Sequence, residues 1–319
     1  AAKDFDLFPG EAKNIVLKDI LIDLKFRDET LISTGLWLPP GVQGTITFEP
    51  TSPTNPLKPN RQITSIESNE GSSNSSSNER EINDEIDDMI HRSDLTIQVG
   101  SHSQSLLTKP GPWLRWPIVV SVYPVTGTET KIYSPHGGIV YFAVSGLPLE
   151  YSRKVVTLRC HKCCRYPRLI KSKPEVWEKT KDNDIPWGEI VTKNIILTVP
   201  TKYIYEVEED RNNCIDRLDL LIKKINKIMY YDVERPNRVV FDVETMNPHP
   251  RPDYPIMMNV NDINGILLAN NVPNSSLFSL IRVLANLSLR EGFFDEMTEN
   301  ALDALVATIV FNDFFPNFN

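Results

Sequence analysis

The chain of 319 residues carries 34 Lys and Arg against 42 Asp and Glu, a net charge of −8, and 40% of its residues are hydrophobic. This length and composition predict a globular protein of about two domains. The acidic balance argues against a nucleic-acid partner, because backbone phosphates attract clustered Lys and Arg. No run approaches the ~18 apolar residues of a membrane span, so we expect no transmembrane segment. No secretory signal is visible, and because the chain begins with Ala1 and stops at Asn319 we expect a piece of a longer protein.

Short apolar and β-branched runs, separated by proline and glycine, fill the first half of the chain. They occur at Ile15–Leu24, Thr45–Phe48, Leu95–Val99, Pro117–Tyr123, Ile139–Val144 and Val155–Leu158. Short strands at this spacing predict a β-sandwich-like domain over residues 1–175. Between about Thr51 and Ser93 the composition changes to Ser, Asn, Glu and Asp, which predicts a disordered insertion at 51–93.

From about Trp177 the pattern changes to mixed α and β. Ile190–Val199 predicts one apolar strand, and Val239–Val243 predicts a second, buried strand. Apolar residues three and four apart predict the helices, which are Cys214–Tyr231, Asn264–Ala269, Leu277–Leu289 and Glu299–Phe311. The predicted fold class is therefore α+β, with a second domain over residues 176–319 that contains a small sheet and ends in helices.

Five short motifs follow one another along the chain. They are Phe8-Pro9-Gly10, Ser33–Gly41, Gly137–Tyr141, Pro186–Ile190 continuing to Asn194–Thr201, and Tyr254–Met257. In this order they resemble the enhancin-like, mucin-targeting zinc metallopeptidases, and most closely the animal TRP melastatin channel-associated factors. The resemblance implies an N-terminal β-domain followed by a gluzincin-type peptidase domain, which we expect to be truncated at its C-terminus.

Peptidases of this family carry His-Glu-x-x-His on a helix, which brings two imidazoles to one face and a general base to the zinc-bound water. Aligned with that motif, this sequence has Ile281 and Ala285 at the ligand positions and Arg282 in place of the base. The third ligand position corresponds to Glu299, or to Glu296 in a competing register. A catalytic zinc needs about three protein ligands, so the resemblance implies an inactive peptidase that holds no cofactor.

Arg282 suggests a specific interaction in place of the metal. If Glu299 still points into the former zinc site, its buried charge needs a cation, and a guanidinium can supply two donors. We therefore expect Arg282 to pair with Glu299. The alternatives are a solvated Arg282 or a surface pair with Glu291 or Asp295.

Four neighbouring residues form a second candidate site. Cys160, His161, Cys163 and Cys164 resemble half of a zinc site, although only Cys214 and scattered histidines offer further ligands. Alternatively, thiols of lowered pKa beside Arg and Lys could be redox-sensitive or lipidated. Simple packing and solvent exposure is the third reading.

Two surface features also allow more than one interpretation. Trp113 and Trp116, placed between prolines, suit stacking on a sugar or covering a sheet edge. A basic stretch in this acidic protein suits anionic lipid, an acidic partner or a solvated strand edge. Its members are Arg153, Lys154, Arg159, Lys162, Arg165, Arg168, Lys171 and Lys173.

The sequence therefore predicts a non-enzymatic binding module. By resemblance, its partner is a membrane ion channel of the TRP type, whose trafficking or gating it regulates, and its location is cytoplasmic and peripheral to the plasma membrane. The first alternative is a secreted or cell-surface zinc metallopeptidase that acts on glycoproteins, with zinc held by Cys160, His161, Cys163 or His249 together with Glu299, or by residues further along a longer chain. The second alternative is a glycan-binding remnant of such a peptidase.

Overall fold

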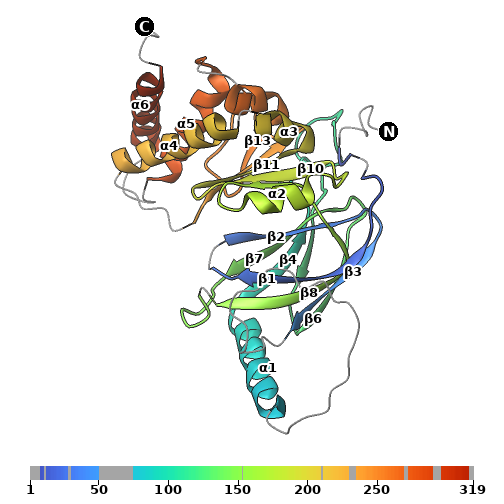
Figure 1. The fold of residues 1–319 in the computed structure, drawn as a ribbon. Coiled ribbons are helices and arrows are strands. Elements are labelled where there is room, and N and C mark those ends of the chain that lie inside the picture. Colours follow the sequence, from blue (N-terminus) through green and yellow to red (C-terminus); the bar gives the residue numbers. More distant parts are fainter. Residues whose placement is uncertain are drawn as a thin grey trace.

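The computed structural model describes residues 8–10, 12–27, 30–49, 75–152, 154–209, 211–229, 235–268, 272–289 and 296–315. Of residues 30, 75–83, 208–209, 211–214, 268 and 296 it describes the backbone only. The described residues form two β-sheets stacked one above the other, with helices on the far side of the second sheet (Figure 1). This mixed α+β architecture confirms the predicted class at that level.

Eight strands form the first sheet. They are β1 Lys18–Lys25, β2 Thr30–Leu38, β3 Gln43–Glu49, β4 Asp94–Val99, β5 Ser121–Pro124, β6 Glu129–Tyr133, β7 Gly138–Ser145 and β8 Val155–Arg165. Their order is β5-β4-β7-β2-β8-β3-β6, with β1 also paired to β8, and each pair is antiparallel. Buried and exposed residues alternate along β3, β4 and β6, so each strand places one row of side chains inside the curled sheet.

The first sheet is close to a barrel rather than the two facing sheets of the predicted sandwich. Its end strands β5 and β6 are joined by side-chain hydrogen bonds instead of a backbone ladder. The Tyr133 amide donates to the Tyr123 hydroxyl over 3.1 Å, and that hydroxyl donates in turn to the Tyr133 carbonyl. These two bonds bring the ends of the sheet together and limit the exposed strand edge at the seam.

Helix α1, Ser75–Arg92, contradicts the prediction of disorder over the second part of the 51–93 insertion; residues 51–74 lie outside the described residues. Ile86, Met89 and Ile90 are buried against the core of the first sheet. Their spacing of three and four residues places them on one helical face. The prediction failed because it rested on average composition, which is dominated by Ser, Asn and acidic residues. Burial of the few apolar residues is enough to offset the conformational entropy lost when the helix forms.

Five strands form the second sheet, in the order β13-β12-β11-β10-β9. They are β9 Arg168–Ile170, β10 Trp187–Val191, β11 Ile195–Pro200, β12 Asn237–Asp242 and β13 Ile256–Asn259. The single strand predicted at Ile190–Val199 is wrong, because the chain reverses and pairs β10 with β11 antiparallel. The reversal is stabilised by the Thr192 hydroxyl, which accepts the amides of Asn194 and Ile195 over 3.1 Å each.

The helices of the second part are α2 Pro174–Thr180, α3 Thr201–Glu209, α4 Arg211–Met229, α5 Ser275–Leu287 and α6 Glu296–Phe314, with a 3-10 turn Val260–Asp262 and a π-helical turn Asn264–Leu268. Helices α3 to α6 share one apolar core with the second sheet. The chain passes between the sheets at Arg165–Arg168, and the predicted domain boundary at 175/176 falls inside α2. Among the described helices, none combines the length and apolar character that a bilayer span requires.

Candidate functional site

Helix α5 carries the positions that align with the zinc-binding motif. It begins after Asn274, whose Oδ1 accepts the Leu277 amide over 2.9 Å and caps the first turn. Ile281 and Ala285 are completely buried in the apolar core of the second sheet. Both side chains lack lone pairs for a metal, so these positions contribute packing where the family resemblance implies ligands.

Arg282 lies on the same helix but reaches α6. Its Nε donates to Asp303 Oδ1 over 2.7 Å, and its Nη2 donates to Asn300 Oδ1 over 3.4 Å. The predicted pair with Glu299 is therefore wrong. Arg282 pairs instead with Asp303, which lies one helical turn after Glu299. The Asp303 carboxylate is buried and needs a cation, and Arg282 reaches it from a partly exposed position. The side chain of Glu296, which belongs to the competing register, is outside the described residues.

The four residues of the cysteine cluster point in three directions. A bulge at Lys162, with φ of 58°, puts both Cys160 and Cys163 into the interior of the first sheet. Cys164 instead faces the second sheet, where its Sγ approaches the Trp37 carbonyl at 3.7 Å. His161 is partly exposed and pairs with Asp19 over 3.0 Å.

Burial raises the pKa of the Cys160 thiol, and it raises the pKa of Cys163 and of Cys164 to about 12. These thiols are therefore poor nucleophiles, contrary to what a redox-sensitive or lipidated cluster requires. Across the described ranges, no three His, Cys, Asp or Glu side chains gather closely enough to hold a metal ion. The packing interpretation fits the geometry of this cluster best.

Half of the basic stretch is paired with carboxylates. Its four paired members are Lys154 with Glu85, Arg159 with Glu49, Arg168 with Glu189, and Lys171 with Asp216 and Asp219. Arg153 lies outside the described residues. This pairing lowers the positive charge that the stretch can offer to anionic lipid.

A buried polar cluster joins the two sheets and was not predicted from the sequence. At its centre is Glu189 on β10, which has no solvent-exposed surface. Its Oε1 accepts from Arg238 Nη1 over 2.8 Å and from the Ser33 hydroxyl over 2.7 Å, and its Oε2 accepts from the Tyr166 hydroxyl over 2.6 Å. Arg168 adds a second guanidinium, with Nε 3.3 Å from Oε2.

Charge and hydrogen bonding keep this carboxylate ionised. Burial by itself would raise the pKa of Glu189, but Arg238, Arg168 and the hydroxyl donors together hold that pKa below its ordinary value. The sequence signal was present, since an acidic residue inside the apolar run of β10 must have a buried partner. Its partners could not be identified because they come from distant segments of the chain.

A second buried ion pair attaches the β4–β5 loop to the end of β12. Arg115 Nε donates to both carboxylate oxygens of Asp242 over 2.9 Å, and its Nη2 donates to Asp242 Oδ2 over 2.8 Å. Close by, His102 Nε2 lies 3.0 Å from the Phe241 carbonyl. Burial, and to a smaller extent Arg115, lower the pKa of His102 to about 4 against the opposing pull of Asp242.

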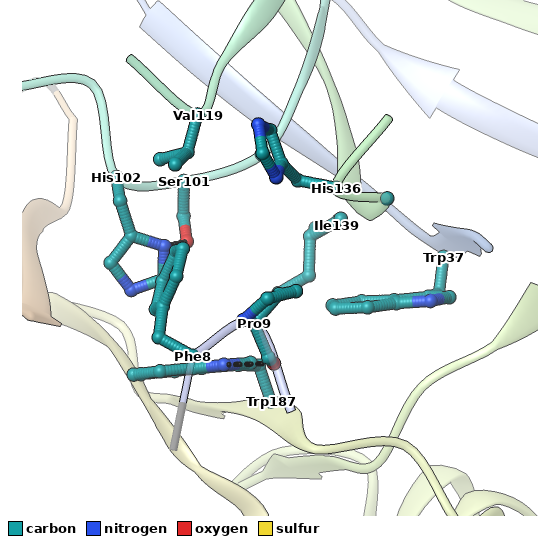
Figure 2. Close-up of a pocket in the computed structure, with 12 residues that line it drawn as sticks. Phe8, Pro9, Trp37, Ser101, His102, Val119, His136, Ile139 and Trp187 are labelled. Carbon is teal, nitrogen blue, oxygen red and sulfur yellow. Dashed lines mark hydrogen bonds between the residues drawn. The ribbon is translucent and has the colours of Figure 1, made fainter. Parts of the chain in front are cut away.

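The His102 ring lines a small cavity between the sheets. Phe8, Trp187 and Trp37 form other walls, and Figure 2 shows the Trp187 Nε1 bond to the Pro9 carbonyl, which is 2.9 Å long. The cavity volume of about 10 Å³ is enough for one water molecule, so it is too small for an organic ligand.

A larger groove lies where the first sheet meets the segment before β13. Its volume is about 420 Å³, which is in the range of small-molecule sites. Hydroxyl and amide side chains, including Thr96, Gln98 and Ser145, line the side formed by β4 and β7, and Tyr254 and Pro255 form the other side. No residue of the zinc-motif alignment borders the groove.

Comparison with known proteins identifies the class of fold. Residues 17–157, which span most of the first sheet, match the model of the N-terminal domain of M60-like peptidases. IMPa of Pseudomonas aeruginosa, solved with an O-glycopeptide, matches 94% of this chain and 34% of its own with a TM-score of 0.60 and 9% identity. The match to ZmpB metallopeptidase of Clostridium perfringens covers 91% of this chain and 58% of ZmpB, with a TM-score of 0.56 and 11% identity. The fold is therefore that of M60 peptidase domains.

Sequence relatives narrow the resemblance to one animal group. TRPM8 channel-associated factor 3 of Mus musculus is 28% identical over 214 residues, which are 65% of this chain and 23% of the relative. TRPM8 channel-associated factor 2 of Homo sapiens is 28% identical over 202 residues, which are 62% and 22% respectively. The chain thus spans less than a quarter of the length of these relatives. The resemblance found in the sequence motifs is confirmed.

Proposed function

We propose that this protein is a catalytically inactive, peptidase-like binding module that associates with a TRP-type ion channel. The peptidase-like fold and the similarity to channel-associated factors support the two halves of this proposal. We further propose that it acts at the cytoplasmic face of the plasma membrane, where it regulates trafficking or gating of the channel.

One observation supports the proposed lack of peptidase activity. Two positions that should present imidazoles to zinc hold Ile281 and Ala285, and both side chains are sealed in the apolar core. The position of the general base holds Arg282, whose guanidinium is engaged by Asp303. Restoring a zinc site here would need three new side chains and would place polar groups in the core, which is costly. We therefore propose no cofactor.

Elemental analysis of the full protein, purified without chelator, tests the inactivity. We expect zinc well below one equivalent per chain, with a catalytically active M60 peptidase purified in parallel as the positive control. About one tightly held equivalent, together with chelator-sensitive cleavage of a mucin-like glycoprotein, would establish the metallopeptidase alternative instead.

Channel association needs its own experiment. When the full protein and TRPM8 are expressed together, we expect the channel to be captured with the protein, and an unrelated channel of similar abundance to be absent. Equal recovery of both channels would contradict the association.

A glycan-binding remnant is the second candidate function, because the fold neighbour IMPa was solved with an O-glycopeptide. Binding to a glycoprotein array without metal, combined with failure to capture the channel, would favour it over the first candidate.

A further inference from the structure

Arg165, the last residue of β8, carries a positive charge that no described residue balances. Its side chain is partly buried, and it makes no hydrogen bond or ion pair with any residue that the structure describes. Burial, and after it the neighbouring charge of Arg168, lower the pKa of Arg165. A guanidinium that is withdrawn from water normally has an anionic partner, because burying an unpaired charge is costly.

Arg168, at the start of β9, also has donors to spare. Its side chain is 17% exposed, and its buried Nε lies 3.3 Å from Glu189 Oε2 without the alignment of a hydrogen bond. That oxygen already accepts the Tyr166 hydroxyl over 2.6 Å. Nη1 of Arg168 lies beside Gly35, where an added Cβ would be 3.1 Å away. The lack of a side chain at Gly35 therefore leaves space next to this nitrogen.

Strand pairing puts the two arginines in one place, where the chain passes from the first sheet to the second. Leu36 of β2 lies opposite Arg165 of β8. Gly35, which Arg168 Nη1 approaches, is the residue directly before Leu36. The two guanidiniums thus belong to the same seam between the sheets, and each acts on the other as a like charge.

The balance of charge at this seam is positive. Arg238 is the third guanidinium there, and it pairs with Glu189 over 2.8 Å. In the described ranges, Glu189 is the only carboxylate within ion-pair distance of Arg168 or Arg238, and Arg165 has none. One carboxylate against three guanidiniums leaves two positive charges unbalanced.

We infer that Arg165 and Arg168 bind a dianionic phosphate group at the seam between the two sheets. A phosphate monoester carries a charge of about −1.5 to −2 near neutral pH and offers three acceptor oxygens, which matches the excess charge, whereas a carboxylate would leave one charge unbalanced. Guanidiniums suit this ligand because their N–H donors bind phosphate oxygens in pairs.

The position of the site limits the source of the phosphate. Both side chains are recessed between the sheets, so we expect a free phosphate compound, or a phosphate at the end of a flexible side chain, in preference to the surface of a membrane. The inference goes beyond the proposed function and does not depend on it.

Inorganic phosphate tests the inference on the full protein, with the ionic strength held constant by sodium chloride. We expect saturable binding by isothermal titration calorimetry, and a thermal unfolding midpoint that rises with phosphate concentration. Acetate, with a single charge, should bind at least tenfold more weakly. A phosphoserine derivative with blocked termini distinguishes the two sources. Tighter binding than inorganic phosphate indicates a phosphorylated side chain, and weaker binding indicates a free phosphate compound.

Arg165→Gln should lower the affinity for phosphate at least tenfold. Without phosphate, this variant should unfold at the temperature of the wild type or above it, because it loses an unbalanced charge and leaves the pairs of Glu189 intact. The control is Lys173→Gln, which removes an exposed cation of the same basic stretch and should bind phosphate as the wild type does.

Absence of saturable phosphate binding would overturn the inference. So would equal affinity in Arg165→Gln and the wild type, or equal affinity for acetate and phosphate. A lower unfolding temperature of Arg165→Gln without phosphate would also overturn it, since Arg165 would then already have a stabilising partner. Binding to vesicles of phosphatidic acid, with none to inorganic phosphate, would identify a membrane contact instead. These measurements involve neither zinc nor the channel, so their failure is distinguishable from failure of the proposed function.

Discussion

Arg282 on α5 donates from Nε to Asp303 Oδ1 on α6 over 2.7 Å, and the two partners differ sharply in exposure. The Asp303 side chain is 6% exposed, whereas that of Arg282 is 42% exposed. A buried carboxylate therefore depends on a cation that reaches it from the rim of the helix pair. Asn286 Nδ2 adds a long contact of 3.4 Å to Asp303 Oδ2.

Arg282→Ala should lower the free energy of unfolding by about 1–3 kcal/mol, because it leaves Asp303 buried without its main partner. Glu299→Gln, one turn before Asp303 on α6, is the control and should change stability by less than about 0.5 kcal/mol. Urea unfolding of both variants measures this. A larger effect of the Glu299 substitution would restore the pairing that the sequence suggested.

His102 should make stability depend on pH. The unfolded chain protonates this imidazole below about 6.5, whereas the folded chain does so only near 4, so the unfolded state binds more protons between these values. Stability from this group is complete above pH 6.5 and falls on acidification, by about 3 kcal/mol in total. Urea unfolding at several pH values should show this slope.

His102→Gln should flatten the slope between pH 6.5 and 4. His249→Gln, which changes an exposed side chain, should leave the slope unchanged. An identical pH profile in the wild type and in His102→Gln would mean that His102 is protonated equally in both states.

Glu189→Gln should lower the free energy of unfolding by about 3–5 kcal/mol, because Arg238 and Arg168 would lose the charge that balances them in a buried site. Glu178→Gln removes the carboxylate of an exposed pair with Lys181 and should change stability by less than about 0.5 kcal/mol. Similar losses in the two variants would show that the buried cluster contributes no more than a surface pair.

The thiols of Cys160, Cys163 and Cys164 should resist alkylation in the folded protein at pH 8, since burial raises their pKa far above that value. Iodoacetamide labelling followed by peptide mapping should find them modified only after unfolding in guanidinium. Rapid labelling of the folded protein would contradict their burial. Protection that disappears with a chelator alone would indicate a bound metal.

Local patterns were sufficient for much of the fold. Alternation and β-branched residues predicted most strands of the first sheet, and spacings of three and four predicted α4, α5 and α6 close to their observed bounds. Two strands of the first sheet were missed, β2 because Gly35 interrupts its pattern and β6 because it contains few apolar residues. In the second sheet β9 and β13 were missed, because strands of three and four residues are too short to show a pattern. Local patterns also failed at β10 and β11, where a polar turn of three residues reverses the chain inside one apolar run.

The sites were harder because their partners are distant in sequence. Glu189 meets Ser33 across 156 residues and Arg238 across 49, and nothing in the local sequence specifies either contact. Asp303 could not be preferred over Glu299 from spacing, since both lie on α6 one turn apart. Only the burial of Asp303 distinguishes them.

The strands β3 and β4 have a practical consequence for work with this protein. Each is paired on both sides within the first sheet, β3 with β6 and β8, and β4 with β5 and β7. We therefore expect these pairings to tolerate a fluorescent protein or affinity tag inserted between Glu49 and Ser75. Such a tag would report on channel association while leaving the sequences of α5 and α6 unchanged.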